Sequence, residues 1–253
     1  MPELRPGNAT INAKGGETLA AVQEAAGLAG QWLPVDAPGS VTIAELCERR
    51  DGGPREARYG QLRGRVLSVA ARGLRFGTEA VKDVAGYDVR RAWLGEVPVA
   101  QVTLRLTARL PWRLDVLLRG GDAFALAERL RALSSAPAAI VVLAPDLVAV
   151  SDDAPASQAA RRTSDLAQAA RIAGAELEPL TRVDWLSCCS GLPPVRVRMA
   201  GRDAQHALPA LDGPWAYDAG RRLALVGDGI AAPRRGPEPS AELIARVREA
   251  LTP

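Results

Sequence analysis

The chain is poor in the residue types on which metal, redox and acid–base chemistry most often depend. It has one histidine, His206, and aromatic residues make up 4% of its 253 residues, so the core must be built from Leu, Val and Ala. The cysteines are Cys47 and the adjacent pair Cys188 and Cys189, a number and spacing that provide neither a disulfide framework nor a zinc or iron–sulfur site. We expect these thiols to be buried as small hydrophobic groups.

Long apolar runs and clusters of one charge are missing as well. Residues 1–6 lack the form of a signal peptide, and the most apolar stretch, 138–144, is too short to span a bilayer. We therefore expect a cytoplasmic protein without direct membrane insertion, whose association with a membrane, if any, runs through partner subunits. Arginine pairs are scattered among acids and the net charge is only +3, which predicts a solvated surface and no binding of nucleic acid.

The remaining pattern predicts two α+β domains, 1–110 and 111–253, because the order of elements starts afresh after Leu110-Pro111. The first should hold strands at 9–14, 62–71, 74–76 and 99–106, a helix from Glu17 and a helix at 41–50. In the second, strand, helix, hairpin and helix occur twice, at 112–173 and 194–251. Two such halves would share one antiparallel sheet backed by helices.

One stretch, Lys-Asp-Val-Ala-Gly-Tyr-Asp at residues 82–88, stands out among the loops. It follows a short apolar strand and a Gly, and Asp88 is suited to cap a helix that starts there. A helix N-terminus also favours an anion. On local chemistry alone, a purely structural strand–turn–helix and an anion site both remain open.

Several segments together resemble a known family. They are Gln31-Trp32-Leu33-Pro34-Val35-Asp36, Arg58-Tyr59-Gly60, Leu74-Arg75-Phe76-Gly77, the run at 82–88 and Val102-Thr103-Leu104-Arg105-Leu106. Their order and spacing are similar to those of FAD-linked oxidases of the PCMH type, and most of all to the FAD-binding E subunits of bacterial glycolate oxidases. The resemblance is good over residues 9–110 and loose beyond them.

The resemblance implies an FAD-linked oxidase domain, truncated at its N-terminus, followed by an α+β cap domain with an antiparallel sheet. It implies a subunit of a glycolate oxidase complex, in which a catalytic flavoprotein subunit and an iron–sulfur subunit oxidise glycolate to glyoxylate. No catalytic residue is assigned to this chain. The residues that would contact FAD are Ser40, Val41, Thr42, Tyr59, Gly60, Lys82, Gly86, Tyr87 and Asp88.

Three expected cofactor loops depart from the family pattern. The Gly-rich opening loop is not found, the paired glycines of the second loop are missing from residues 40–45, and the third loop is shortened to residues 95–98. In the second loop a carboxylate, Glu45, stands where backbone would approach phosphate. The sequence therefore leaves an alternative open, a flavin-free scaffold subunit of the same or a related oxidoreductase complex. An independent oxidase is disfavoured, since no base and carboxylate-binding Arg are seen together.

Overall fold

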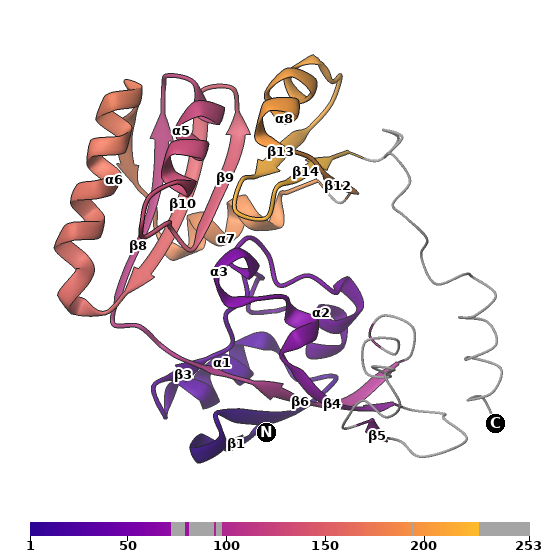
Figure 1. The fold of residues 1–253 in the computed structure, drawn as a ribbon. Helices are drawn as coiled ribbons and strands as arrows, with labels where there is room; N and C mark the ends of the chain where they lie inside the picture. Colours follow the sequence, from indigo (N-terminus) through magenta and orange to yellow (C-terminus); the bar gives the residue numbers. More distant parts are fainter. Residues whose placement is uncertain (72–78, 81–93, 95–97, 194, 228–253) are drawn as a thin grey trace.

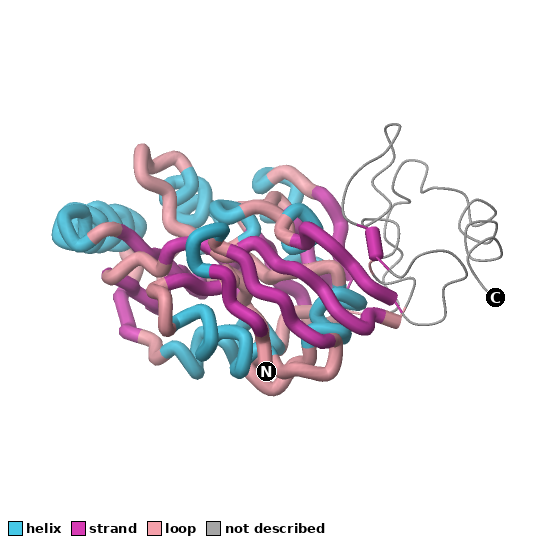
Figure 2. The backbone as a smooth tube through the Cα atoms, turned by 90° about the horizontal axis from the view of Figure 1, so that it is seen from below, coloured by secondary structure: helices cyan, strands magenta, loops and turns pink. Residues whose placement is uncertain are grey.

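The computed structural model describes residues 1–71, 79–80, 94, 98–193 and 195–227 (Figure 1). Its N-terminal part is built on a five-stranded sheet in the order β1-β2-β6-β4-β5, with every neighbouring pair antiparallel. The strands run side by side across the near face in Figure 2. Their bounds are β1 Glu3–Arg5, β2 Thr10–Lys14, β4 Val66–Ala71, β5 Glu79–Ala80 and β6 Val99–Arg105.

Three helices and a small two-stranded sheet complete this part of the chain. Their bounds are α1 Leu19–Gly27, α2 Ile43–Arg49, α3 Glu56–Tyr59, β3 Gln31–Trp32 and β7 Thr107–Ala108. Single 3-10 turns occupy Pro6–Asn8 and Leu62–Gly64. The strand expected at 62–71 is thus wrong over its first residues. Gly64 and Arg65 close tight turns onto Gln61 and Leu62 there, and a glycine has no side chain to pack in a strand.

The C-terminal part is built on a seven-stranded antiparallel sheet in the order β11-β8-β10-β9-β13-β14-β12. This confirms the expected α+β architecture with an antiparallel sheet backed by helices. The strand at Glu176–Pro179 was not expected, because all four residues are exposed and show no alternation. The strand bounds are β8 Trp112–Arg119, β9 Ala139–Ala144, β10 Leu147–Ala154, β11 Glu176–Pro179, β12 Val195–Arg198, β13 Trp215–Asp218 and β14 Leu223–Val226.

Helices cover both faces of this sheet. Their bounds are α5 Ala123–Arg131, α6 Ala159–Ala173, α7 Arg182–Ser190 and α8 Gly201–Ala207, with 3-10 turns at Ala156–Gln158 and Leu208–Ala210. Val116 and Val150 face a core shared with α5, α6 and α8, whereas Ala149 packs with Trp185 of α7 on the opposite face. Since side chains alternate along a strand, Asp115 is turned toward the α7 side.

The N-terminal and C-terminal parts have hydrophobic clusters of their own. One cluster is drawn from residues 11–106, and the two others are drawn from residues beyond 113. The predicted boundary between residues 110 and 111 falls between the two sheets and stays a prediction. The strand expected at 74–76, the third loop apart from Pro98 and the helix expected at 240–251 lie outside the described residues. No helix among the described residues is long and apolar enough to cross a membrane.

Candidate functional site

Arg55 lies at the centre of the contact between the two parts, and its side chain is fully buried. Its Nε donates to Asp36 Oδ1 at 3.1 Å, Nη1 donates to Asp153, and Nη2 donates to the hydroxyl of Ser151. Nη2 also lies 3.6 Å from Asp115 Oδ1. A guanidinium carries its donors in a rigid fork, so one Arg can bind several acceptors at once. We call Arg55, Asp36, Asp115, Ser151 and Asp153 the Arg55 cluster.

A tight turn just before α3 fixes Arg55 in this position. Gly53 has φ +86°, and a Cβ there would lie 2.7 Å from Cβ of Asp36. Only glycine accepts both the backbone conformation and the close approach. The turn brings the backbone N–H of Arg55 to Asp36 Oδ2 at 3.0 Å. Asp36 therefore binds the backbone as well as the side chain of Arg55.

Strands β8 and β10 supply the other acceptors of the cluster. Ser151 pairs with Asp115 and Asp153 pairs with Arg113 across the two strands, so these side chains share one face of the sheet. The hydroxyl of Ser151 donates to Asp115, which also accepts from Nε of Arg113 at 2.8 Å. The sheet therefore presents a preformed set of acceptors to Arg55.

Helix α7 closes the cluster from the side. Trp185 is fully buried and its Nε1 donates to Asp36 Oδ1 at 2.8 Å, while Nη1 of Arg182 donates to the same oxygen at 3.2 Å. Burial and the nearby charge of Arg113 lower the pKa of Arg182 to about 10. Asp36 thus accepts hydrogen bonds both from Arg55 of the N-terminal part and from Arg182 and Trp185 of α7.

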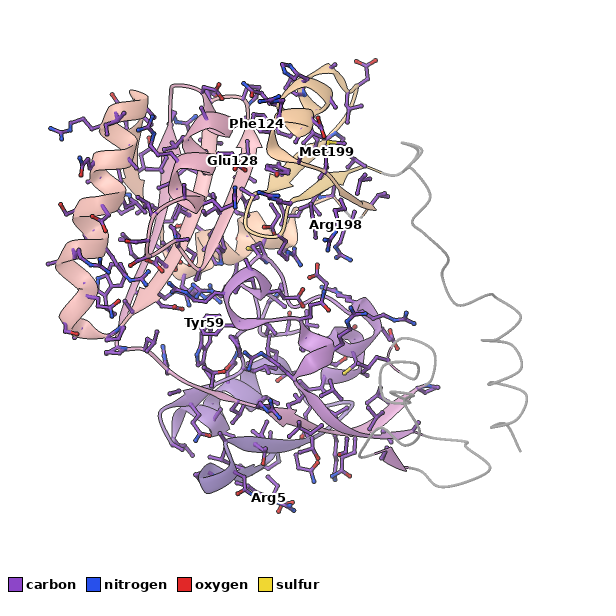
Figure 3. All side chains as sticks on the ribbon, viewed as in Figure 1. Arg5, Tyr59, Phe124, Glu128, Arg198 and Met199 are labelled. Carbon is purple, nitrogen blue, oxygen red and sulfur yellow. The ribbon has the colours of Figure 1, made fainter. Side chains whose placement is uncertain are left out.

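Tyr59, a predicted FAD contact, is part of this interface, as Figure 3 shows at the junction of the two parts. Its hydroxyl donates to Asp153 Oδ1 at 2.6 Å, and its ring packs edge-on to Trp32 with ring centroids 5.6 Å apart. Burial and the bond to Asp153 raise the pKa of the Tyr59 phenol. Arg58 beside it donates to Asp152 Oδ1 at 2.9 Å.

A second group of charges joins the two parts farther along the interface. Nε of Arg221, in the turn after β13, lies 2.5 Å from Asp218, and its Nη1 lies 2.6 Å from Asp51 and 3.1 Å from Glu56. Arg196 binds the other oxygen of Asp51 at 2.6 Å. We call these residues the Arg221 cluster.

In the Arg221 cluster, burial raises the pKa of the carboxyl groups, whereas the neighbouring arginines lower it. Burial opposes the ionisation of Asp51, but Arg221 and Arg196 outweigh it and lower the pKa of this carboxyl. Burial raises the pKa of the fully buried Asp218 in spite of its pairing with Arg221. The expectation that the arginine pairs lie on a solvated surface is therefore wrong for Arg221, whose side chain is 11% exposed.

The remaining predicted cofactor residues lie apart from the Arg55 cluster or outside the described residues. Gly60 ends α3 at φ +80° and is exposed, as is Ser40, whereas Val41 is buried and Thr42 half-buried. Lys82, Gly86, Tyr87 and Asp88 lie outside the described residues.

The backbone N–H groups of residues 41–45 are all engaged within the protein. Val41 donates to Pro38 O at 3.1 Å, and residues 43 and 44 donate to the carbonyl oxygens of residues 17 and 15, both at 2.9 Å. Thr42 donates to Glu45 Oε2 at 2.8 Å, and Glu45 donates back to Thr42 Oγ1 at 3.2 Å. This reciprocal pair is a capping box that starts α2.

The hydrogen bonds of the capping box determine whether this loop can bind the pyrophosphate of FAD. A diphosphate needs free N–H donors, and these donors are already bonded. The hydrogen bonds from Thr42 lower the pKa of Glu45, so a negative charge occupies the start of α2 at neutral pH. Among the described residues, no buried side-chain atom left without a hydrogen bond belongs to residues 40–45. This loop does not fit the pyrophosphate.

The single histidine of the chain, His206, is exposed on α8, across the seven-stranded sheet from the Arg55 cluster. Cys47 is buried as expected, whereas Cys188 and Cys189 are half-buried, and Cys189 packs against the hydrophobic cluster around Trp185. No group of metal-ligating side chains occurs in the part of the chain that the structure describes.

Comparison with known proteins adds a family likeness to this geometry. No protein-family model matches the chain. It is 34% identical over 98 residues to the glycolate oxidase subunit GlcE of Escherichia coli (strain K12), and the match covers 36% of this chain and 28% of that subunit. The resemblance expected from the sequence is thereby confirmed.

Solved structures extend the likeness to most of the fold. Two crystal forms of alkyldihydroxyacetonephosphate synthase superpose with TM-scores of 0.64 and 0.60, at 11% and 12% identity. The fold is that of the FAD-linked oxidases. The superpositions cover 89% and 74% of this chain, but only 60% and 44% of the synthase chains.

Sequence reasoning missed the residues that form the interface. Asp36 lay inside a family-like segment, yet its partners are up to 149 positions away in the chain. The run Ser151-Asp152-Asp153 carried a usable signal, because three polar residues continue an apolar strand without a turn residue between them. Such a run at the end of a buried strand indicates partners on another element.

Proposed function

We propose that this chain is a subunit of a glycolate-oxidase-type complex and does not itself carry out the oxidation. A catalytic flavoprotein subunit and an iron–sulfur subunit would oxidise glycolate to glyoxylate, and this chain would support their assembly. The observation that carries the proposal is the 34% identity to a glycolate oxidase subunit, found on a chain with the FAD-linked oxidase fold.

The contacts of the described residues favour a role in assembly over a catalytic role. Oxidation of a 2-hydroxy acid needs a base near the alcohol proton and an Arg for the carboxylate. The single histidine is exposed on the far face of the sheet. The buried guanidiniums of Arg55 and Arg221 are engaged with carboxylates of the chain itself. A substrate carboxylate would have to displace these partners.

An FAD-binding role for this chain is a separate and less supported part of the proposal. The resemblance implies it, and the run at 82–88 is its best sequence match. Against it, the N–H donors of residues 41–45 are bonded internally, and Tyr59 is bound to Asp153. The finer choice between an FAD-binding subunit and a flavin-free scaffold therefore depends on these contacts.

Co-expression with the catalytic flavoprotein and iron–sulfur subunits of a glycolate oxidase complex tests the proposed function. We expect the chain to co-elute with both in gel filtration, and glycolate turnover to require the flavoprotein subunit. The isolated chain should show no turnover. Steady oxidation of glycolate by the isolated chain, or its elution apart from both subunits, would contradict the proposal.

A further inference from the structure

The start of α2 carries an anion that belongs to the chain itself, the carboxylate of Glu45. In the capping box, the carboxylate of Glu45 accepts from both the N–H and the hydroxyl of Thr42, at 2.8 and 3.0 Å. The chain has a second capping box at the start of α7, where Asp184 accepts from the N–H and the hydroxyl of Thr181 at 3.1 and 2.6 Å. Glu45 therefore satisfies its helix in the same way as a purely structural cap.

The interface between the two parts also contains a buried cation of the chain itself, the guanidinium of Arg55. All three guanidinium nitrogens of Arg55 are engaged by Asp36, Asp153 and Ser151, and its Cζ lies 5.4 Å from the ring centroid of Trp32. The side chain has no exposed surface. Packing between the parts is close elsewhere too, since a Cβ on Gly220 would lie 2.7 Å from Cβ of Ala57. At Arg55 and at Gly220 the described interface is thus filled by groups of the chain itself.

These two features lead to one conclusion about the cofactor. We propose that this chain keeps the FAD-linked oxidase fold as a flavin-free unit, in which Glu45 takes the place of phosphate at the second loop and Arg55 holds the two parts together. The inference deepens the proposed function, because a subunit without flavin contributes structure rather than electron transfer. It rests on contacts of the described residues and not on the partner subunits.

The test is a titration of the isolated 253-residue chain with FAD, followed by gel filtration and by thermal unfolding. We expect no flavin absorbance to co-elute with the chain. We also expect no change in Tm with excess FAD, because only a ligand that binds the folded state raises Tm. Flavin co-eluting in stoichiometric amount, or a saturable rise in Tm, would overturn the inference.

Two matched variants test the role of Glu45. Glu45→Ala and Asp184→Ala each remove the acid of a capping box, but only the first frees donors in the predicted cofactor loop. We expect both variants to lose Tm and neither to retain FAD, since the N–H groups of residues 41, 43 and 44 stay bonded to carbonyl oxygens of the chain. Stoichiometric FAD on Glu45→Ala alone would show that Glu45 by itself excludes FAD, and would overturn the role given to the other bonded donors.

Failure of this inference is distinct from failure of the proposed function. A chain that binds FAD and also joins the flavoprotein and iron–sulfur subunits would be an FAD-binding subunit of the complex. A chain that binds neither FAD nor those subunits would uphold the flavin-free fold and contradict membership in the complex.

Discussion

The Arg55 and Arg221 clusters join the same two parts of the chain but differ in their access to water. The side chain of Arg55 is 0% exposed, and its carboxylate partners are at most 5% exposed. In the Arg221 cluster, Arg196 and Asp51 keep exposures of 35% and 14%. Water can replace a lost partner at the Asp51–Arg196 edge of the second cluster but not in the first cluster.

This difference shows what each cluster requires of its members. A charge removed from water is costly unless every partner is in place, so the buried cluster is sensitive to the loss of any member. A partly solvated ion pair is screened and contributes less. The contrast predicts the greatest loss of stability when Arg55 is replaced and smaller losses at the other positions.

Arg55→Met should destabilise the chain most. The substitution leaves the carboxylates of Asp36 and Asp153 buried with fewer partners, and breaking a buried pair in this way costs about 3–5 kcal/mol. The free energy of unfolding from urea titration gives the measurement. Arg129→Met removes the same charge from an exposed position of α5 and is the control. A loss no larger than that of the control would show that the cluster does not hold the parts together.

Arg221→Met should cost less, about 1–3 kcal/mol at neutral pH, because it leaves buried Asp218 unpaired while Arg196 remains on Asp51. The cost should shrink as the pH falls. Burial already raises the pKa of Asp218, and loss of Arg221 raises it further, so the folded state takes up the proton before the unfolded state does. Urea titrations at neutral and mildly acidic pH measure the trend. A cost that grows in acid would contradict this account.

Gly53→Ala should destabilise the chain through the turn that positions Arg55. A non-glycine residue at φ +86° costs about 1–2 kcal/mol, and the added Cβ would also contact Asp36. Gly174→Ala is the control, since Gly174 also has a positive φ, +68°, but no atom within 4 Å of an added Cβ. Thermal unfolding of the two variants should show the larger loss of Tm for Gly53→Ala. Equal losses would mean that the contact with Asp36 has no effect.

Tyr59→Phe should have the smallest effect at neutral pH, about 1 kcal/mol, because Asp153 keeps Arg55 and Arg58. The cost of the substitution should shrink in alkali. Since the pKa of Tyr59 is raised in the folded state, its contribution is present below the unfolded pKa of about 10 and is lost as the pH rises above it. The variant should therefore lose less stability than the wild type in alkaline urea titrations. An identical decline in both proteins would show that Tyr59 does not drive it.

Local patterns in the sequence were enough to predict much of the fold. Alternation at 99–106 predicted a strand that the structure confirms as β6, in which Val102 and Leu104 are buried and Gln101 and Arg105 exposed, so burial and periodicity agree. The hairpin expected within 112–173 is confirmed as β9 and β10, whose residues are buried in continuous runs. β11 escaped prediction because an exposed edge strand needs no such spacing.

The candidate site was much less predictable. Arg55 and Asp153 are 98 positions apart, and neither has a local sequence feature that names the other. Tyr59 was selected through family resemblance, and its contact with a strand of the other sheet followed only from the way the two parts pack. Pairing across an interface depends on tertiary geometry, which propensity and periodicity do not encode.

The Arg55 cluster also constrains how this sequence can change over evolutionary time. A neutral residue at 36, 115 or 153 leaves an unbalanced buried charge, while apolar residues at all of these positions and at 55 could pack without one. Single substitutions are therefore harmful where a joint replacement is tolerated, so their effects are not additive. Arg55, Asp36, Asp115 and Asp153 should accordingly be inherited as a group, each position retained for as long as the others are.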